Sequence, residues 1–70
     1  MLLNCDAGAT VTVMKLATDD AEFRDFLLTL GCYEGQEITV ISKKRHSMVV
    51  AVKDGRYNID DEIAKLILVA

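Results

Sequence analysis

Apolar and polar residues alternate along residues 9–16, and the period then changes. The alternation of two residues predicts a β-strand in this first segment. Between residues 19 and 30 the apolar side chains recur every three or four positions, which places them on one face of an α-helix. The members of this stripe are Phe23, Phe26, Leu27 and Leu30. The pattern therefore predicts a helix over 19–30 whose stripe faces the core.

The ends of this helix carry their own signals. Asp19 can cap its N-terminus, and Glu22, three residues later, completes a capping box. Asp20 and Arg24 form an i,i+4 pair of opposite charge on the outer side of the helix. Gly31 follows the last residue of the stripe, where a left-handed backbone is favoured. These signals limit the helix on both sides.

Four more strands are predicted after the helix, at residues 38–42, 47–52, 57–59 and 66–69. Residues 47–52 are apolar at both parities, which is typical of a central strand covered on both faces. The dipeptide at Asp54 and Gly55 predicts a hairpin turn before residue 57. The acids at 60–62 open a short helical turn, because the helix dipole favours negative charge at its N-terminus.

Five short strands with one inserted helix cannot form a parallel doubly wound sheet, because the crossover connections are missing. They can close as a small antiparallel barrel, and closure removes the exposed edges of an open sheet. The chain has 70 residues and shows no linker or internal repeat. We therefore expect one mainly β domain over residues 1–70, with the helix between the first two strands.

The composition favours a binding module over an enzyme. A chain of 70 residues has too small a core to enclose an active-site cleft. It contains one histidine and neither a Ser-His-Asp arrangement nor a phosphate-binding loop. The net charge of −3 and the 6% aromatic content speak against a nucleic-acid partner, whose phosphates require a basic face.

The cysteines and the hydropathy pattern indicate a compartment. Cys5 and Cys32 could form one disulfide at most, and two reduced thiols are typical of a cytosolic protein. The N-terminus has no basic segment of a signal peptide, and no apolar run is long enough to cross a membrane. We therefore expect a cytoplasmic protein without direct membrane insertion.

Glycines and apolar residues recur in a defined order along almost the whole chain. They are Gly8, Leu27, Leu30, Gly31, Gly35, Ile38, Val50, Val52, Gly55, Ile59, Ala64, Ile67 and Val69. This combined pattern resembles the FeoA family. Glu34 and Asp61 depart from the family pattern, which has a proline and a leucine at these positions. The resemblance implies a Src-homology-3-like barrel with a helical insertion, in agreement with the predicted order of elements.

The resemblance also implies a function. It suggests a non-enzymatic adaptor of bacterial ferrous iron transport, whose partner is the cytosolic GTPase-bearing part of the membrane transporter FeoB. Two alternatives stay open: a module that binds a transition metal ion directly, as a sensor or for delivery, and a regulatory domain of a metal-responsive repressor system. No cofactor is required, and self-association into a homodimer is a further option.

Four residues are candidate metal ligands for Fe²⁺ or another divalent ion. Cys32 and His46 offer a thiol and an imidazole, and the carboxylates of Asp60 and Asp61 suit a harder divalent cation. They lack the paired spacing of a zinc site. The structural alternative is a turn thiol, a solvated loop histidine and acids that cap a helix.

Two sets of residues are candidates for partner binding. The basic cluster Lys43, Lys44 and Arg45 could contact an acidic partner or the anionic inner leaflet near a membrane transporter, or be a solvated connection. The apolar residues in excess of one barrel interior could face outward and form an interaction patch, unless the inserted helix covers them. These residues are Met14, Leu16, Leu28, Leu66 and Leu68.

Overall fold

The computed structural model describes residues 1–70 and confirms the predicted order of strands and helices. The elements are η1 (Leu2–Asn4), β1 (Thr10–Leu16), α1 (Ala21–Leu30), β2 (Glu37–Lys43), β3 (Ser47–Val52), β4 (Gly55–Asp60), α2 (Asp61–Ala64) and β5 (Ile67–Val69). The helix α1 lies between the first two strands, as expected. The 3-10 helix η1 is the one element that the sequence pattern does not predict.

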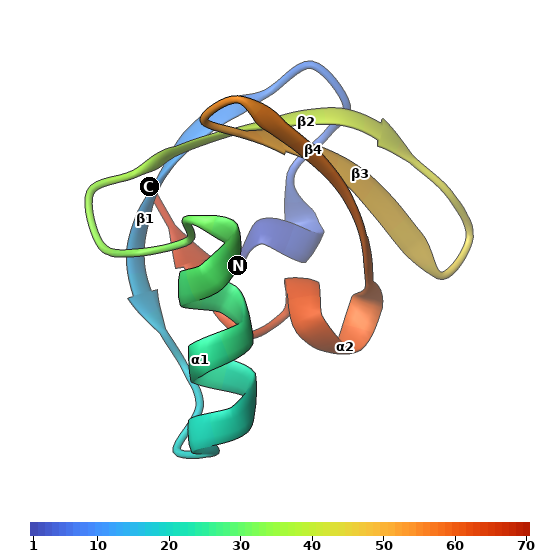
Figure 1. The fold of residues 1–70 in the computed structure, drawn as a ribbon. Helices are drawn as coiled ribbons and strands as arrows, with labels where there is room; N and C mark the ends of the chain where they lie inside the picture. Colours follow the sequence, from blue (N-terminus) through green and yellow to red (C-terminus); the bar gives the residue numbers. More distant parts are fainter.

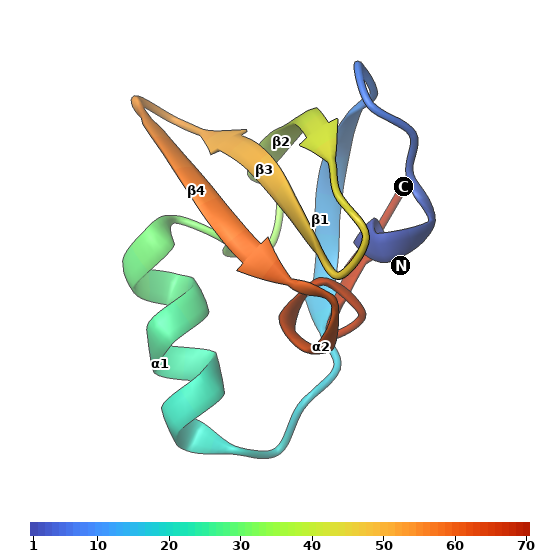
Figure 2. The same cartoon turned by 90° about the vertical axis from the view of Figure 1, so that its right-hand side faces the viewer.

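The five strands form one antiparallel sheet in the order β4-β3-β2-β1-β5. The sheet is strongly curved, and α2 connects its two edge strands (Figures 1 and 2). β4 and β5 do not pair with each other, so the expected closure of the barrel is wrong. The three residues of β5 pair with β1 only, and α2 and η1 pack against each other between the two edges.

The core lies inside the curved sheet and contains only apolar side chains. Its members are Leu2, Val13, Leu16, Leu27, Cys32, Ile38, Val40, Met48, Val50, Val52, Ile59, Ala64 and Ile67. Strand β3 contributes every second residue to it, whereas Val49 and Ala51 on its other face are only half-buried. The strand is therefore fully covered on one face, not on both as its composition suggests.

A β-bulge in β1 changes which of its residues face the core. The register between β1 and β5 shifts between Val13 and Lys15. An extra residue reverses the alternation of the side chains beyond it. Val13 and Leu16 therefore both point inward, and Leu16 is 7% exposed. The expectation that Leu16 faces outward is wrong, whereas Met14 at the bulge is exposed as expected.

The N-terminal cap of α1 and the centre of the β3–β4 hairpin each lie one residue away from the predicted position. The cap of α1 is Asp20, not Asp19, and its carboxylate accepts a hydrogen bond of 2.9 Å from the backbone N–H of Glu22. In the hairpin between β3 and β4, Val52 pairs with Gly55, so the central residues are Lys53 and Asp54. Lys53 adopts the left-handed backbone, with φ at 54°.

Candidate interaction surface

Helix α1 contacts the rest of the molecule mainly through its last turn. Leu27 is fully buried and Leu30 half-buried, whereas residues 21–26 are all exposed. Gly31 ends the helix with φ at 100°, and a Cβ atom there would lie 3.2 Å from the Val52 side chain. This close approach fixes the C-terminal end of α1 against β3. The N-terminal half extends away from the sheet (Figure 2).

Several large apolar side chains of this region are only partly covered by the rest of the molecule. Phe23, Phe26 and Leu28 on α1 are 43%, 46% and 44% exposed, and Tyr33 after the helix is 40% exposed. We call these four residues the exposed α1 surface. Leu28 is exposed as predicted, but the prediction that Phe23 and Phe26 face the core is wrong. The apolar stripe lies on the expected side of the helix, but the sheet does not extend far enough along α1 to cover Phe23 and Phe26.

A groove of about 430 Å³ lies between the C-terminal end of α1 and the β3–β4 hairpin. Its apolar lining comes from Leu28, Leu30, Tyr33, Val52 and Tyr57. The Lys53 ammonium lies over the Tyr33 ring, 4.6 Å from its centroid, which is a cation–π contact. A Cβ atom on Gly55 would overlap the Tyr57 hydroxyl, so the glycine leaves room for the Tyr57 ring in its present position. The groove is therefore open, with an aromatic wall and a cation at its rim.

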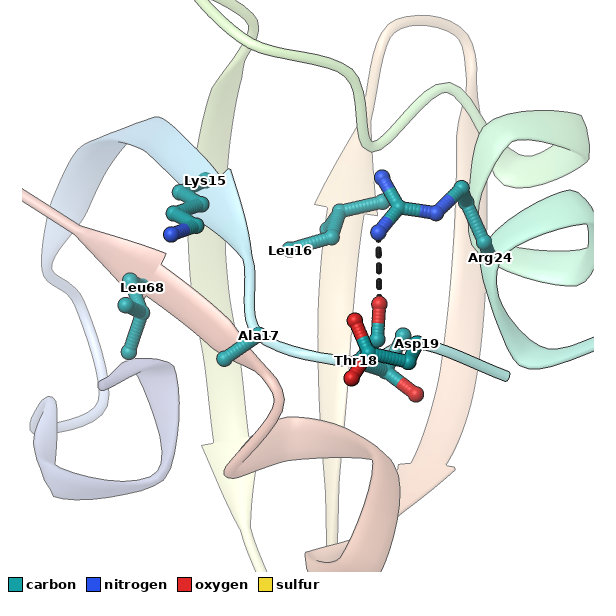
Figure 3. A pocket seen from close by; sticks show the side chains of 7 residues that line it. All are labelled: Lys15, Leu16, Ala17, Thr18, Asp19, Arg24 and Leu68. Carbon is teal, nitrogen blue, oxygen red and sulfur yellow. Dashed lines mark hydrogen bonds between the residues drawn. The ribbon is translucent and has the colours of Figure 1, made fainter. Parts of the chain in front are cut away.

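A second depression, of about 250 Å³, lies between β1, β5 and the start of α1 (Figure 3). The Arg24 guanidinium donates a hydrogen bond to the Thr18 carbonyl oxygen there. The predicted ion pair between Asp20 and Arg24 is therefore not formed, because Arg24 holds the connection before α1 and Asp20 caps the helix. Leu16 and Leu68 contribute apolar wall to this depression.

The other candidate partner residues lie at two further places. Leu66 and Leu68 are half-buried at β5, next to β1 and its exposed Met14. Lys43, Lys44 and Arg45 are exposed at the β2–β3 turn, far from α1 (Figure 1). Lys43 also donates a hydrogen bond of 2.9 Å to the Leu3 carbonyl oxygen. The predicted residues thus do not form one continuous patch.

The four candidate metal ligands do not form a site. Cys32 is 1% exposed, and burial raises the pKa of its thiol to about 11, so it stays protonated at neutral pH. The Asp60 carboxylate caps α2 by accepting a hydrogen bond of 2.9 Å from the Ile63 N–H. The Asp61 N–H bonds to the carbonyl oxygen of exposed His46, at 3.1 Å. Nowhere do three histidine, cysteine or acidic side chains gather to hold a metal ion.

Phe23, Phe26 and Tyr33 are surface residues that were not among the predicted partner-binding residues. No signal in the hydrophobic pattern marks where the sheet ends beneath a helix, so Phe23 and Phe26 could not be recognised as exposed.

None of the helices is long and apolar enough to cross a membrane.

Comparisons with known proteins agree with this architecture. The FeoA domain model matches residues 1–70, whereas a search of the curated proteins finds no match. A crystal structure of an iron uptake regulatory protein (FeoA) superimposes with a TM-score of 0.89 and 20% identity, covering 97% of this chain and 91% of that one.

Two further structures are similar. The zinc complex of FeoA from Stenotrophomonas maltophilia, a prokaryotic SH3 domain protein, has a TM-score of 0.86 at 20% identity and covers 99% of this chain and 87% of that one. A manganese-dependent transcriptional repressor has a TM-score of 0.92 at 20% identity, with 99% of this chain covered but only 39% of the repressor. These likenesses confirm the SH3-like fold with its inserted helix. Since the family model matches the whole sequence, the chain belongs to the FeoA domain family.

Proposed function

We propose that this chain is a cytoplasmic, non-enzymatic adaptor of bacterial ferrous iron transport that acts by binding the cytosolic, GTPase-bearing part of FeoB. The FeoA family is associated with ferrous iron transport and is not a known enzyme family. The similar protein from Stenotrophomonas maltophilia is put forward as a ferrous iron transport activating factor, which supports a role through contact with a transporter.

The exposed α1 surface is the observation that carries this proposal. Four large apolar side chains, each at least 40% exposed, lie on or next to a single ten-residue helix. Water contact with such side chains is unfavourable by roughly 25 cal/mol per Å² of apolar surface. Phe23 and Phe26 lie on one side of α1 and Leu28 on the side that faces the groove, so the helix offers exposed apolar side chains to a partner on two sides.

The basic β2–β3 turn supports the same proposal in a secondary role. Lys43, Lys44 and Arg45 are exposed and take part in no ion pair, since Lys65 and Glu62 form the one salt bridge of the chain. Exposed charges outside the contact area itself mainly raise the association rate with a partner of opposite charge, and physiological salt weakens this effect beyond about 8 Å. We therefore assign steering to the turn and affinity to α1.

Calorimetry with the cytosolic part of FeoB, with and without guanine nucleotide, tests the proposal. We expect association at micromolar concentration, and we expect Phe23→Asp/Phe26→Asp to weaken it about 30-fold, as for central interface residues. Leu28→Asp, as a separate variant, tests the side of α1 that faces the groove. Ile41→Asp is the matched control, because Ile41 is 38% exposed on β2, away from α1. Absence of binding by the unaltered chain would contradict the proposal.

The two alternatives have less support in this chain. A related FeoA binds zinc and a related repressor binds manganese, but here no three candidate ligands lie together. The repressor likeness covers only about a third of that protein's length and concerns the fold.

A further inference from the structure

Strand β4 is an edge strand with a free outer side. It pairs with β3 alone, because the sheet does not close onto β5. In Figure 2 it forms the outermost strand on its side of the sheet. Edge strands with unpaired backbone groups can accept a further strand from another chain.

The register of the hairpin shows which backbone groups are unpaired. Val52 and Gly55 flank a two-residue turn and therefore exchange both of their hydrogen bonds. Bonding then alternates along β4, so Tyr57 and Ile59 also bond to β3. The next bonded pair in this series is His46 with Asp61, and the Asp61 N–H does donate to the His46 carbonyl oxygen at 3.1 Å.

Three residues of β4 consequently direct their backbone groups away from β3. These residues are Arg56, Asn58 and Asp60, and all three side chains are exposed. If two copies of β4 pair antiparallel about Asn58, Arg56 lies opposite Asp60 of the second copy, and the reverse pair forms as well. All three residues then occupy hydrogen-bonded positions of the new ladder, in which Asp60 takes part through its N–H, because its carbonyl oxygen accepts the first hydrogen bond of α2.

We propose that the outer edge of β4 pairs with β4 of a second copy of this chain to form a weak two-fold homodimer. Charge complementarity selects the partner, because one strand carries both Arg56 and Asp60 at the spacing that makes it complementary to itself. It also selects the register. A shift of two residues towards the hairpin turn would place Asp54 opposite Asp60, which is repulsive.

Sedimentation equilibrium of the full chain over a wide concentration range, up to millimolar, tests this dimer. We expect a reversible monomer–dimer equilibrium for the unaltered chain. Arg56→Asp should raise the dimer dissociation constant about tenfold or more, because it places like charges opposite each other twice. Lys44→Asp makes the same change of charge at the β2–β3 turn and should leave the equilibrium unchanged.

Asn58→Pro removes the central N–H of the outer edge. Proline is tolerated on an edge strand where its N–H would face solvent, so the ladder to β3 is kept and circular dichroism should show the native fold. We expect this variant to be monomeric. A monomeric unaltered chain at every concentration would overturn the proposal, and so would a dimer that survives both Asn58→Pro and Arg56→Asp.

A charge exchange provides a positive control. Arg56→Asp and Asp60→Lys chains should each dimerise poorly alone but associate when mixed, because both cross-strand pairs then become complementary. Asp60 also caps α2, so the fold of Asp60→Lys is checked by circular dichroism before mixing. If both variants fold and the mixture stays monomeric while the unaltered chain dimerises, this register is wrong.

Discussion

Cys32 shows how one position in a turn can become part of the core. The residue directly follows the helix-ending Gly31, and its N–H bonds to the Leu27 carbonyl oxygen at 2.9 Å. This bond turns the side chain inward, where it is 1% exposed. Burial disfavours the thiolate and raises the pKa of Cys32 from its ordinary value of 9.0 to about 11.

The raised pKa of Cys32 makes the stability of the protein depend on pH in the alkaline range. Between about pH 9 and 11 the unfolded chain loses the thiol proton while the folded chain keeps it. The contribution of the protonated thiol to the free energy of unfolding should therefore be fully present below pH 9. Above pH 9 the free energy of unfolding should fall, by up to about 1.4 kcal/mol per pH unit. Urea unfolding at pH 8 and at pH 10.5 measures this loss.

The matched variant for this measurement is Cys32→Ala. It is less stable at pH 8, because it leaves a cavity, but it lacks the thiol whose ionisation is measured and keeps every other ionisable group. Its stability should therefore fall less steeply with pH than that of the unaltered chain. Equal slopes would show that Cys32 ionises as freely in the folded chain as in the unfolded one.

At the scale of elements, α1 is the one whose placement differs most from its pattern. The hydrophobic stripe correctly gives the side of the helix that faces inward, since Leu27 and Leu30 lie there. It gives no information on how far the facing sheet extends along the helix. Phe23 and Phe26 lie one turn beyond the supported part and stay exposed, so α1 is held at one end only.

The N-terminal cap of α1 gives a test between two neighbouring acids. Asp20 accepts the hydrogen bond from the Glu22 N–H, whereas no hydrogen bond involves the Asp19 side chain. We expect Asp20→Ala to lower the free energy of unfolding by about 1 kcal/mol, the usual cost of losing a cap. Asp19→Ala removes the same charge next to it and should cost much less. Thermal unfolding of both variants checks this, and equal losses would contradict the assignment of the cap.

At the scale of the whole molecule, an open curved sheet carries a helix that is only partly attached. β2 and β3 lie in the interior of the sheet, and each is paired on both sides. α1 has one fully buried side chain, Leu27. The stability of the backbone should therefore differ strongly between these parts.

Native-state hydrogen exchange measures this difference. We expect the amides of α1 to exchange through a local opening of lower free energy than the amides of β2 and β3, which should exchange only with global unfolding. Addition of a partner that binds the exposed α1 surface should slow exchange in α1 most. Uniform protection of α1 and β3 would show that the helix is part of the same cooperative unit.

Local periodicity was sufficient for the kinds of elements, their order and the antiparallel, mainly β class. Each of these follows from neighbouring residues: alternation at β1, the three-and-four spacing of α1, and the glycine at position 31 that ends the helix. The candidate site was predicted only in part. Leu28 and Met14 are exposed as expected, whereas Leu16 is buried.

The remaining features depend on residues that are distant in the sequence. The bulge opposite β5 reverses the parity at Leu16. The sheet stays open because β5 pairs with β1 and not with β4, and Phe23 and Phe26 stay partly exposed because the rest of the molecule does not cover the N-terminal half of α1. The hydrophobic pattern around a residue predicts on which face of a helix or strand its side chain lies. Whether anything lies there to cover it is a property of the packed surfaces, and those exist only once the strands have paired.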